Sequence, residues 1–201
     1  MFIQIIQASC SRQDELRAQL DRWFTERSPH VQGWLGGTYG FTDDNMFVAV
    51  VRFDSKESAM ANSASRGQSE WWAATEGLLD GPVEFHDCTD VTLMMDGGSD
   101  RAGFVQIIRG RADDPDALRA MMSETELLHQ MRPDILGATL AIADDGTFVE
   151  TVAFTDEAAA RSGEQVEMPE EMRDRMAAAM HDVSFTDLHH PFFASSASGQ
   201  G

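Results

Sequence analysis

The chain has 201 residues and a formal net charge of −19, because 34 acidic residues outnumber 15 basic ones. Nucleic acid and anionic membrane surfaces are therefore not expected as partners, since both require clustered Lys and Arg. No apolar run approaches the ~20 residues of a membrane helix, the N-terminus shows no signal peptide, and the 2 cysteines form no Cys-x-x-Cys pair. We expect a soluble, cytoplasmic protein with no membrane partner and no metal.

The N-terminal part of the chain predicts a strand, a helix and a hairpin. Residues 2–9 alternate and are rich in isoleucine, which is typical of a strand. Ser11 is a candidate cap for a helix with apolar residues at helical spacing. Pro29 ends this helix, because proline disfavours helix in the preceding residue. The apolar runs 34–41 and 46–53 flank a short polar turn and predict a hairpin.

A second helical region and a last strand follow. The helical region begins near Ser55, is broken around Arg66-Gly67 and resumes over 71–79. Residues 83–91 then predict one further strand. The predicted order of elements is therefore β-α-β-β-α-β.

The second half of the chain repeats the first. The segment 2–6, Phe-Ile-Gln-Ile-Ile, returns about 100 residues later as 104–108, Phe-Val-Gln-Ile-Ile, and the turn region 43–48 returns as 144–149. Offsets that drift by single residues indicate a duplication with small loop deletions. Further matches are Phe53 with Phe154, Phe85 with Phe185, and Asp87 with Asp187.

The second copy carries clear local signals of its own. Asp114 followed by Pro115 is typical of a helix start, and Asp145-Gly146 is typical of a hairpin turn. A second helical region from Asp156 is broken around 167–169 and resumes before a last strand.

The element order predicts an α+β fold of two tandem ferredoxin-like βαββαβ repeats, each with an antiparallel sheet and two helices on one face. The first strand is apolar on both sides, since Phe2 and Ile6 point one way and Ile3 and Ile5 the other. Both sheet faces must be covered, so we expect the repeats to pack sheet-to-sheet as an intrachain dimeric α/β barrel, either a monomeric pseudo-dimer or a weak homodimer. The expected boundaries are repeat 1 at 1–95, a linker at 96–103, repeat 2 at 104–193 and a disordered tail at 194–201.

A ferredoxin-like unit of about 100 residues, with a helix after Phe-Asp-Ser-Lys-Glu-Ser-Ala (53–59) and tryptophans further along it, resembles the antibiotic biosynthesis monooxygenase superfamily. The resemblance covers nearly the whole chain as two fused copies. It implies a pseudo-dimeric barrel with a pocket in each half, between the sheet and the second helix. Relatives include cofactor-free quinone-forming monooxygenases, haem-degrading monooxygenases and isomerases, so the fold does not fix the reaction.

The resemblance implies catalytic roles for Asn62 and Trp72 and a substrate-binding role for Trp71, all in the second helical region of repeat 1. In the cofactor-free members, an Asn and a Trp on this helix hold a phenolic substrate and its developing anion. Such a role requires donors aimed at an oxyanion inside an apolar pocket. The alternatives are that Asn62 faces solvent or caps the helix break, and that the tryptophans pack in the core.

Four further positions are candidates. Gln4, as a polar group inside a strand, either binds substrate or makes a cross-interface hydrogen bond repeated at Gln106. Trp34 and Tyr39 either bind substrate in an aromatic pocket or pack as ordinary strand residues. His86, on the last strand of repeat 1, is a candidate catalytic acid or base at neutral pH, with a plain strand-end histidine as the alternative.

No cofactor is expected. The sequence has no phosphate loop, dinucleotide fingerprint, nucleophile elbow or metal-ligand spacing. Haem-degrading relatives use a histidine on the second helix, and repeat 1 has none between Asp54 and Asp80.

The expected partner is a small hydrophobic or aromatic molecule bound to repeat 1. All 4 tryptophans lie in this repeat, whereas repeat 2 has Ser162 and Met172 at comparable places. Three functions fit: a cofactor-independent monooxygenase or isomerase acting on a small aromatic or polyketide-like molecule, a non-catalytic protein that binds such a molecule, or a structural protein. An aromatic cavity reached by Asn62 favours the first two, and a pocket filled by Trp71 or Trp72 favours the third.

Overall fold

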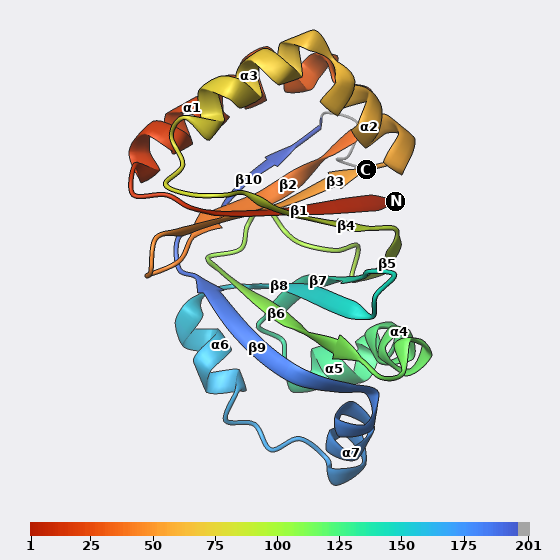
Figure 1. The fold of residues 1–201 in the computed structure, drawn as a ribbon. Coiled ribbons are helices and arrows are strands. Elements are labelled where there is room, and N and C mark those ends of the chain that lie inside the picture. Colours follow the sequence, from red (N-terminus) through yellow and green to blue (C-terminus); the bar gives the residue numbers. More distant parts are fainter. Residues whose placement is uncertain (197–201) are drawn as a thin grey trace. The chain divides into compact units, whose positions relative to one another are not determined.

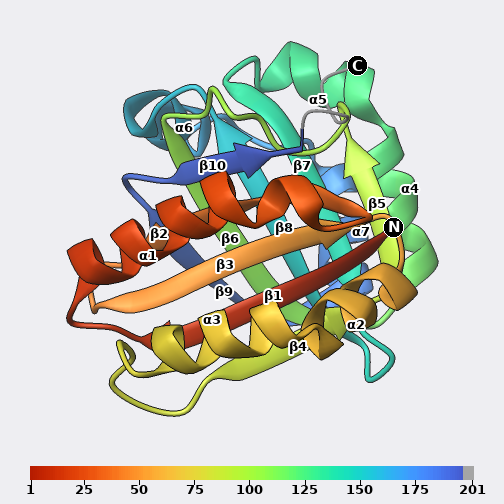
Figure 2. The same cartoon turned by 90° about the horizontal axis from the view of Figure 1, so that it is seen from above.

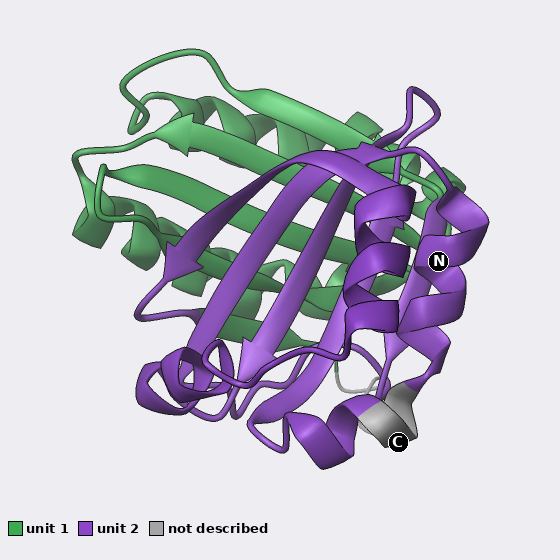
Figure 3. Cartoon of the chain, turned by 90° about the horizontal axis from the view of Figure 1, so that it is seen from below, with its two compact units in different colours: residues 1–89, 192–201 green, residues 90–191 purple. Residues whose placement is uncertain are grey.

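The computed structural model describes residues 1–196 and divides the chain into two compact units (Figure 3). Unit 1 comprises residues 1–89 and the C-terminal segment from Phe192, and unit 2 comprises residues 90–191. Each unit contains a five-stranded antiparallel sheet with helices on one face (Figures 1 and 2). The expected α+β fold with two ferredoxin-like units is confirmed.

Unit 1 follows the predicted order, with its second helical region divided into two helices. Its sheet has the strand order β10-β2-β3-β1-β4, and its first three strands begin and end where the sequence predicted. The elements are β1 (Phe2–Ser9), α1 (Gln13–Glu26), a 3-10 turn (Ser28–His30), β2 (Trp34–Phe41), β3 (Met46–Phe53), α2 (Lys56–Ala64), α3 (Arg66–Glu76), β4 (Glu84–Cys88) and β10 (Phe192–Ser195).

Unit 2 has the same order, with both of its helical regions divided. Its sheet has the strand order β5-β7-β8-β6-β9. Asp114 caps the first helix as predicted, since its Oδ1 accepts a hydrogen bond of 3.0 Å from the Ala117 backbone N–H. The elements are β5 (Asp90–Met94), β6 (Phe104–Ala112), α4 (Pro115–Ser123), α5 (Thr125–Met131), β7 (Ile135–Ile142), β8 (Thr147–Phe154), α6 (Glu157–Gly163), α7 (Glu170–Ala179) and β9 (Met180–Leu188). None of the helices in the described residues is long and apolar enough to cross a membrane.

In each sheet, the fifth strand comes from the segment that follows the fourth strand of the other unit. The prediction of one strand over 83–91 is wrong, because β4 ends at Cys88 and pairs with β1, whereas β5 begins at Asp90 and pairs with β7. β10 likewise pairs with β2, so Ala194 and Ser195, which were expected in a disordered tail, are strand residues. The rest of that tail, 197–201, lies outside the described residues. Each exchanged strand satisfies backbone groups that an edge strand would otherwise leave unpaired.

β10 approaches β2 closely at Gly36, next to a bulge between Trp34 and Gly36. Gly36 has a φ of 142°, and a Cβ added there would lie 2.5 Å from the Ala194 carbonyl oxygen. Both the backbone conformation and the contact therefore require glycine at this position.

The break in the second helical region of unit 1 lies at Ser65, one residue before the predicted Arg66-Gly67. Ser55 caps α2 and Ser65 caps α3, and each hydroxyl accepts a hydrogen bond of 3.2 Å from the backbone N–H three residues later. The extended conformation of Ser65 turns the chain between the two helices, so that α3 begins earlier than the predicted segment 71–79.

Candidate functional site

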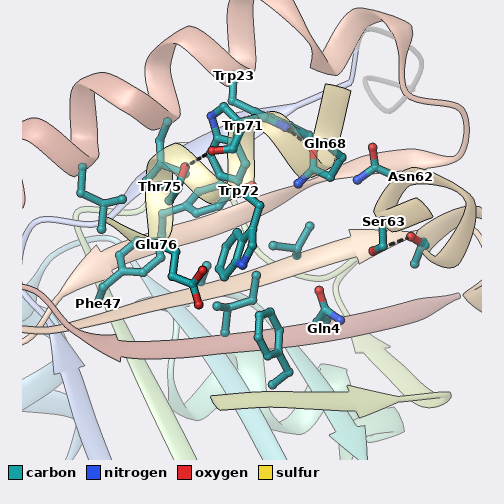
Figure 4. Close-up of a pocket in the computed structure, with 18 of the residues that line it drawn as sticks. Gln4, Trp23, Phe47, Asn62, Ser63, Gln68, Trp71, Trp72, Thr75 and Glu76 are labelled. Atoms are coloured by element: carbon teal, nitrogen blue, oxygen red, sulfur yellow. Dashed lines mark hydrogen bonds between the residues drawn. The ribbon is translucent and has the colours of Figure 1, made fainter. Parts of the chain in front are cut away.

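Unit 1 contains a cavity of about 380 Å³ between its helices and the face of the sheet that they cover (Figure 4). The sheet side is formed by β1 and β3, through Gln4, Ile6 and Phe47 among others. The helix side is formed by α1, α2 and α3. Most of the lining side chains are apolar or aromatic, which is typical of a site for a small organic molecule.

One stripe of α3 forms much of the helix side. Gln68, Trp71, Trp72, Thr75 and Glu76 all line the cavity, and they follow one another at the three- and four-residue spacing of one helix face. The sequence predicted only the two tryptophans. The other three lie about one helical turn before or after the tryptophans, so their position on the same helix face could have been predicted from the sequence.

The indole N–H groups of two lining tryptophans are already bonded. Trp23 Nε1 donates to Gln68 Oε1 at 2.9 Å, and Trp71 Nε1 donates to the Gln19 carbonyl at 3.4 Å. Trp72 differs, because its Nε1 has no hydrogen-bond partner within the described residues. Its ring lies 5.4 Å from that of Phe85, between centroids, and extends from α3 toward the sheet in Figure 4. Trp72 therefore presents both a ring and a donor to a ligand.

Amide groups gather at one end of the cavity, where Figure 4 places Asn62, Gln68 and Gln4. The Asn62 backbone carbonyl accepts a hydrogen bond of 3.0 Å from Ser65, but its side-chain amide has no partner in the described part of the chain. Gln4 Nε2 donates to Asp87 Oδ1 at 2.9 Å, which fixes the amide and leaves its carbonyl oxygen available. This end can accept and donate hydrogen bonds, whereas Figure 4 places Phe47, Thr75 and Glu76 toward the opposite end.

Two lining residues carry ionisable groups. Tyr39 is 3% exposed, and burial raises the pKa of its hydroxyl above the ordinary value, so that it stays protonated. Its ring lies 5.0 Å from that of Phe24 and stacks on that of Phe192 at 5.5 Å. Glu76, by contrast, is solvent-exposed and has no hydrogen-bond partner among the described residues. It is available to a ligand at the mouth of the cavity.

Five of the seven predicted site residues line this cavity, and Trp34 and His86 do not. Trp34 is 4% exposed and packs edge-on against Trp23, with 5.2 Å between ring centroids, so it is a core residue that supports the lining. His86 pairs with Ile5 on β1, and its neighbour Phe85 points into the cavity. Because side chains alternate along a strand, His86 lies on the opposite face, with its Nε2 3.7 Å from the Glu84 carboxylate. It cannot serve as an acid or base in the cavity.

Unit 2 differs at the matching positions of its sheet. Glu150 takes the place of the cavity-lining Ala49 and pairs in register with Ile108 and Leu140. Alternation along β8 puts it on the same face as Phe148, inside the core of this unit. Burial raises the pKa of Glu150 to about 7.

Ion pairs occupy the part of unit 2 that corresponds to the amide end of the cavity. Gln106 Nε2 donates to Asp187 Oδ1 at 3.0 Å, as Gln4 does to Asp87. Arg161 then pairs with Asp187, and its Nη1 lies 2.9 Å from Glu164 Oε1. The Gln–Asp hydrogen bond is thus repeated in both units, but it joins neighbouring strands of one sheet and is not the cross-interface bond that was the alternative for Gln4 and Gln106.

Among the side chains that the structure describes, which exclude those of residues 125–127 and 197–201, no group of three His, Cys, Asp or Glu is arranged to hold a metal ion.

Comparison with known proteins shows which solved structures share this fold. No family model matches the chain, and no curated protein matches it. Among solved structures, a "putative monooxygenase" from Lactobacillus acidophilus has a TM-score of 0.75 at 12% identity, covering 96% of this chain and 95% of that one. A "putative monooxygenase" from Fusobacterium nucleatum has a TM-score of 0.75 at 8% identity, covering 97% and 94%. The chain shares the fold of these proteins.

An "anthrone oxidase-like protein" is also similar, with a TM-score of 0.68 at 10% identity over 100% of this chain and 95% of that one. The expected fold is thereby confirmed by solved structures that are named as putative monooxygenases and as anthrone oxidase-like. At these identities the likeness concerns the fold alone, so the chemistry has to be inferred from the cavity.

Proposed function

We propose that unit 1 is a cofactor-independent monooxygenase that oxidises a small phenolic or polyketide-like aromatic molecule. The observation that supports it is the cavity of about 380 Å³, lined by aromatic rings and holding two donors, the Asn62 amide and the Trp72 indole, that lack partners within the described residues. Pockets for small organic molecules begin at roughly 300 Å³, so the volume is sufficient for a flat molecule of two or three fused rings.

In the proposed reaction, the substrate itself is the electron donor. Loss of a phenolic proton to water gives an anion whose oxygen accepts hydrogen bonds from Asn62 Nδ2 and Trp72 Nε1. O₂ then oxidises a ring methylene: one oxygen atom becomes the carbonyl oxygen, and the other leaves as water with the two methylene hydrogens. No external reductant is needed. Each donor that is aimed at the developing charge in a dry site typically contributes about 10²- to 10³-fold to kcat.

The test is oxygen consumption by the purified protein with a panel of anthrones and naphthols, together with the absorbance of the quinone product. Asn62→Ala is expected to lower kcat at least 10-fold, on the scale of a lost oxyanion donor. Ser162→Ala, on the corresponding helix α6 of unit 2, is the control and is expected to have no effect.

A non-catalytic protein that binds the same class of molecule is the second candidate. It is favoured by Glu76, the one carboxylate in the described lining, because this group is exposed and is not held by a hydrogen bond as a positioned base would be. Binding of the panel without oxygen consumption would support this second function and contradict the first.

A further inference from the structure

The described lining of the unit 1 cavity carries a negative charge and no positive charge. Glu76 is the one ionised side chain among its described lining residues, and none of these residues is Lys, Arg or His. Asp87 adds a second carboxylate at the amide end, since its Oδ1 lies 2.9 Å from Gln4 Nε2. Both of these carboxylates are negative, and the one cation that acts by charge on a described lining group is Arg52, at the hydroxyl of Tyr39.

In unit 2 the matching carboxylate is paired with a cation, Arg161, which also pairs with Glu157 and Glu164. There, Arg161 pairs with the Asp187 carboxylate that holds Gln106. Arg161 is the fifth residue after the N-cap of α6, and the fifth residue after the N-cap of α2 is Met60, which is 62% exposed. The cation that pairs with this carboxylate in unit 2 is thus replaced in unit 1 by an uncharged side chain.

An aromatic side chain lies next to the available carboxylate. Trp72 precedes Glu76 by one helical turn on the same face, and the two side chains lie side by side in Figure 4. The ring of Trp72 lies 6.0 Å from that of Trp71, between centroids. A cation over a tryptophan face is attracted by the ring quadrupole, and a neighbouring carboxylate adds a charge attraction. An anionic ligand would lose hydration here with no cation in the described lining to replace it.

We propose that the cavity selects aromatic molecules that carry a protonated amine, admits neutral ones and discriminates against carboxylates. The flat body of the ligand packs against Trp71 and Trp72, and its ammonium group lies beside Glu76. This inference rests on the proposed function, because it specifies which substrates the same cavity takes.

The test is a calorimetric titration at pH 7 with three probes of one shape: 2-naphthylmethylamine, which is cationic, 2-naphthol, which is neutral, and 2-naphthoate, which is anionic. The amine is expected to bind about 3- to 10-fold more tightly than the naphthol, on the scale of a cation–π contact with an exposed ion pair. The naphthoate is expected to bind at least 10-fold more weakly than the naphthol, because a buried unpaired charge is costly.

Glu76→Gln is expected to reduce the preference for the amine by about 3-fold and to leave the affinity for 2-naphthol unchanged. Glu26→Gln, on exposed α1 surface outside the cavity, makes the same change in net charge and is expected to leave all three affinities unchanged. Raising NaCl from 0.05 to 0.5 M is expected to weaken amine binding in the unmodified protein, and less so in Glu76→Gln.

The outcomes separate the two proposals. Equal binding of all three probes, or an amine preference that survives Glu76→Gln, would overturn this inference and leave an aromatic site in place. Failure of every probe to bind would contradict the cavity as a ligand site and, with it, the proposed function.

Discussion

Glu150 should make the protein less stable as the pH rises through neutrality. Its carboxyl group lies among the apolar residues of unit 2 between Ile108 and Leu140, and burial raises its pKa from 4.5 to about 7. Between these two values the folded protein binds more protons than the unfolded chain, so the free energy of unfolding falls as the pH increases. The penalty is absent below about pH 4.5 and complete above about pH 7.

The size of the effect follows from the shift. At about 1.36 kcal/mol per pKa unit, the full shift corresponds to roughly 3 kcal/mol. Glu150 keeps some solvent exposure, so we expect Glu150→Gln to stabilise unit 2 by about 1–3 kcal/mol at pH 8.5 and by much less at pH 5.

Urea unfolding at the two pH values measures this difference. All 4 tryptophans lie in unit 1, so the transition of unit 2 must be followed by circular dichroism rather than by tryptophan fluorescence alone. Glu167→Gln, an exposed carboxylate of the same unit, is the matched control and should stay within about 0.5 kcal/mol of the unmodified protein at both pH values. An equal effect of Glu150→Gln on the free energy of unfolding at pH 5 and pH 8.5 would refute the claim that the Glu150 carboxyl group is buried with a raised pKa.

Three further outcomes are expected. Trp72→Phe should weaken 2-naphthol binding by about 1–2 kcal/mol in the calorimetric titration, because the indole donor and part of the ring are lost; an unchanged affinity moves the site elsewhere. Gly36→Ala should destabilise the edge of the unit 1 sheet by at least about 1 kcal/mol and speed hydrogen exchange in β10. Gly81→Ala is the control, because no atom lies within 4 Å of the added Cβ, and it should have neither effect. Equal exchange rates in both variants would contradict the close approach of β10 to Gly36. Fragments 1–96 and 103–193 should fail to form stable folded monomers by size exclusion and circular dichroism, because the first lacks β10 and the second lacks β5; two folded monomers would contradict the exchanged strands.

Local patterns were sufficient for most of the elements. The hairpin of β2 and β3 was predicted to the residue, because each strand is a continuous apolar run and the turn is short and polar. The helix break was predicted within one residue, but the cap is Ser65, and a serine hydroxyl is a weaker signal than the glycine after it.

Long-range pairing was not predictable in this way. β4 and β5 are separated by one residue, so the sequence looks like a single strand. They are two strands only because each pairs with the edge of a different sheet. The same limit explains the error at His86, because the side of a strand that faces a cavity depends on its register with β1. The bulge between Trp34 and Gly36 puts Trp34 on the same face as Tyr39, but its ring packs in the core against Trp23 and does not line the cavity.

The α3 stripe was predicted in part. Trp71 and Trp72 were predicted as site residues because they are large and aromatic. Gln68, Thr75 and Glu76 were not predicted, because single polar residues on a helix do not by themselves indicate a site. Their helical spacing from the tryptophans was visible in the sequence, but their role depends on the empty space beneath them, which only the packing of α1 and α3 over the sheet creates.

The most direct test of the central claim, that an aromatic molecule binds in the cavity beneath α3, is an NMR titration of protein labelled with ¹⁵N at the tryptophan indoles. Trp23, Trp71 and Trp72 line the cavity, and Trp34 does not, so the four indole signals include an internal control. Addition of 2-naphthol is expected to shift Trp72 most, because its ring lines the cavity and its N–H has no partner among the described residues, and Trp34 least, because it lies outside the lining. A titration that leaves Trp72 unmoved, or shifts Trp34 most, would contradict a ligand site in this cavity.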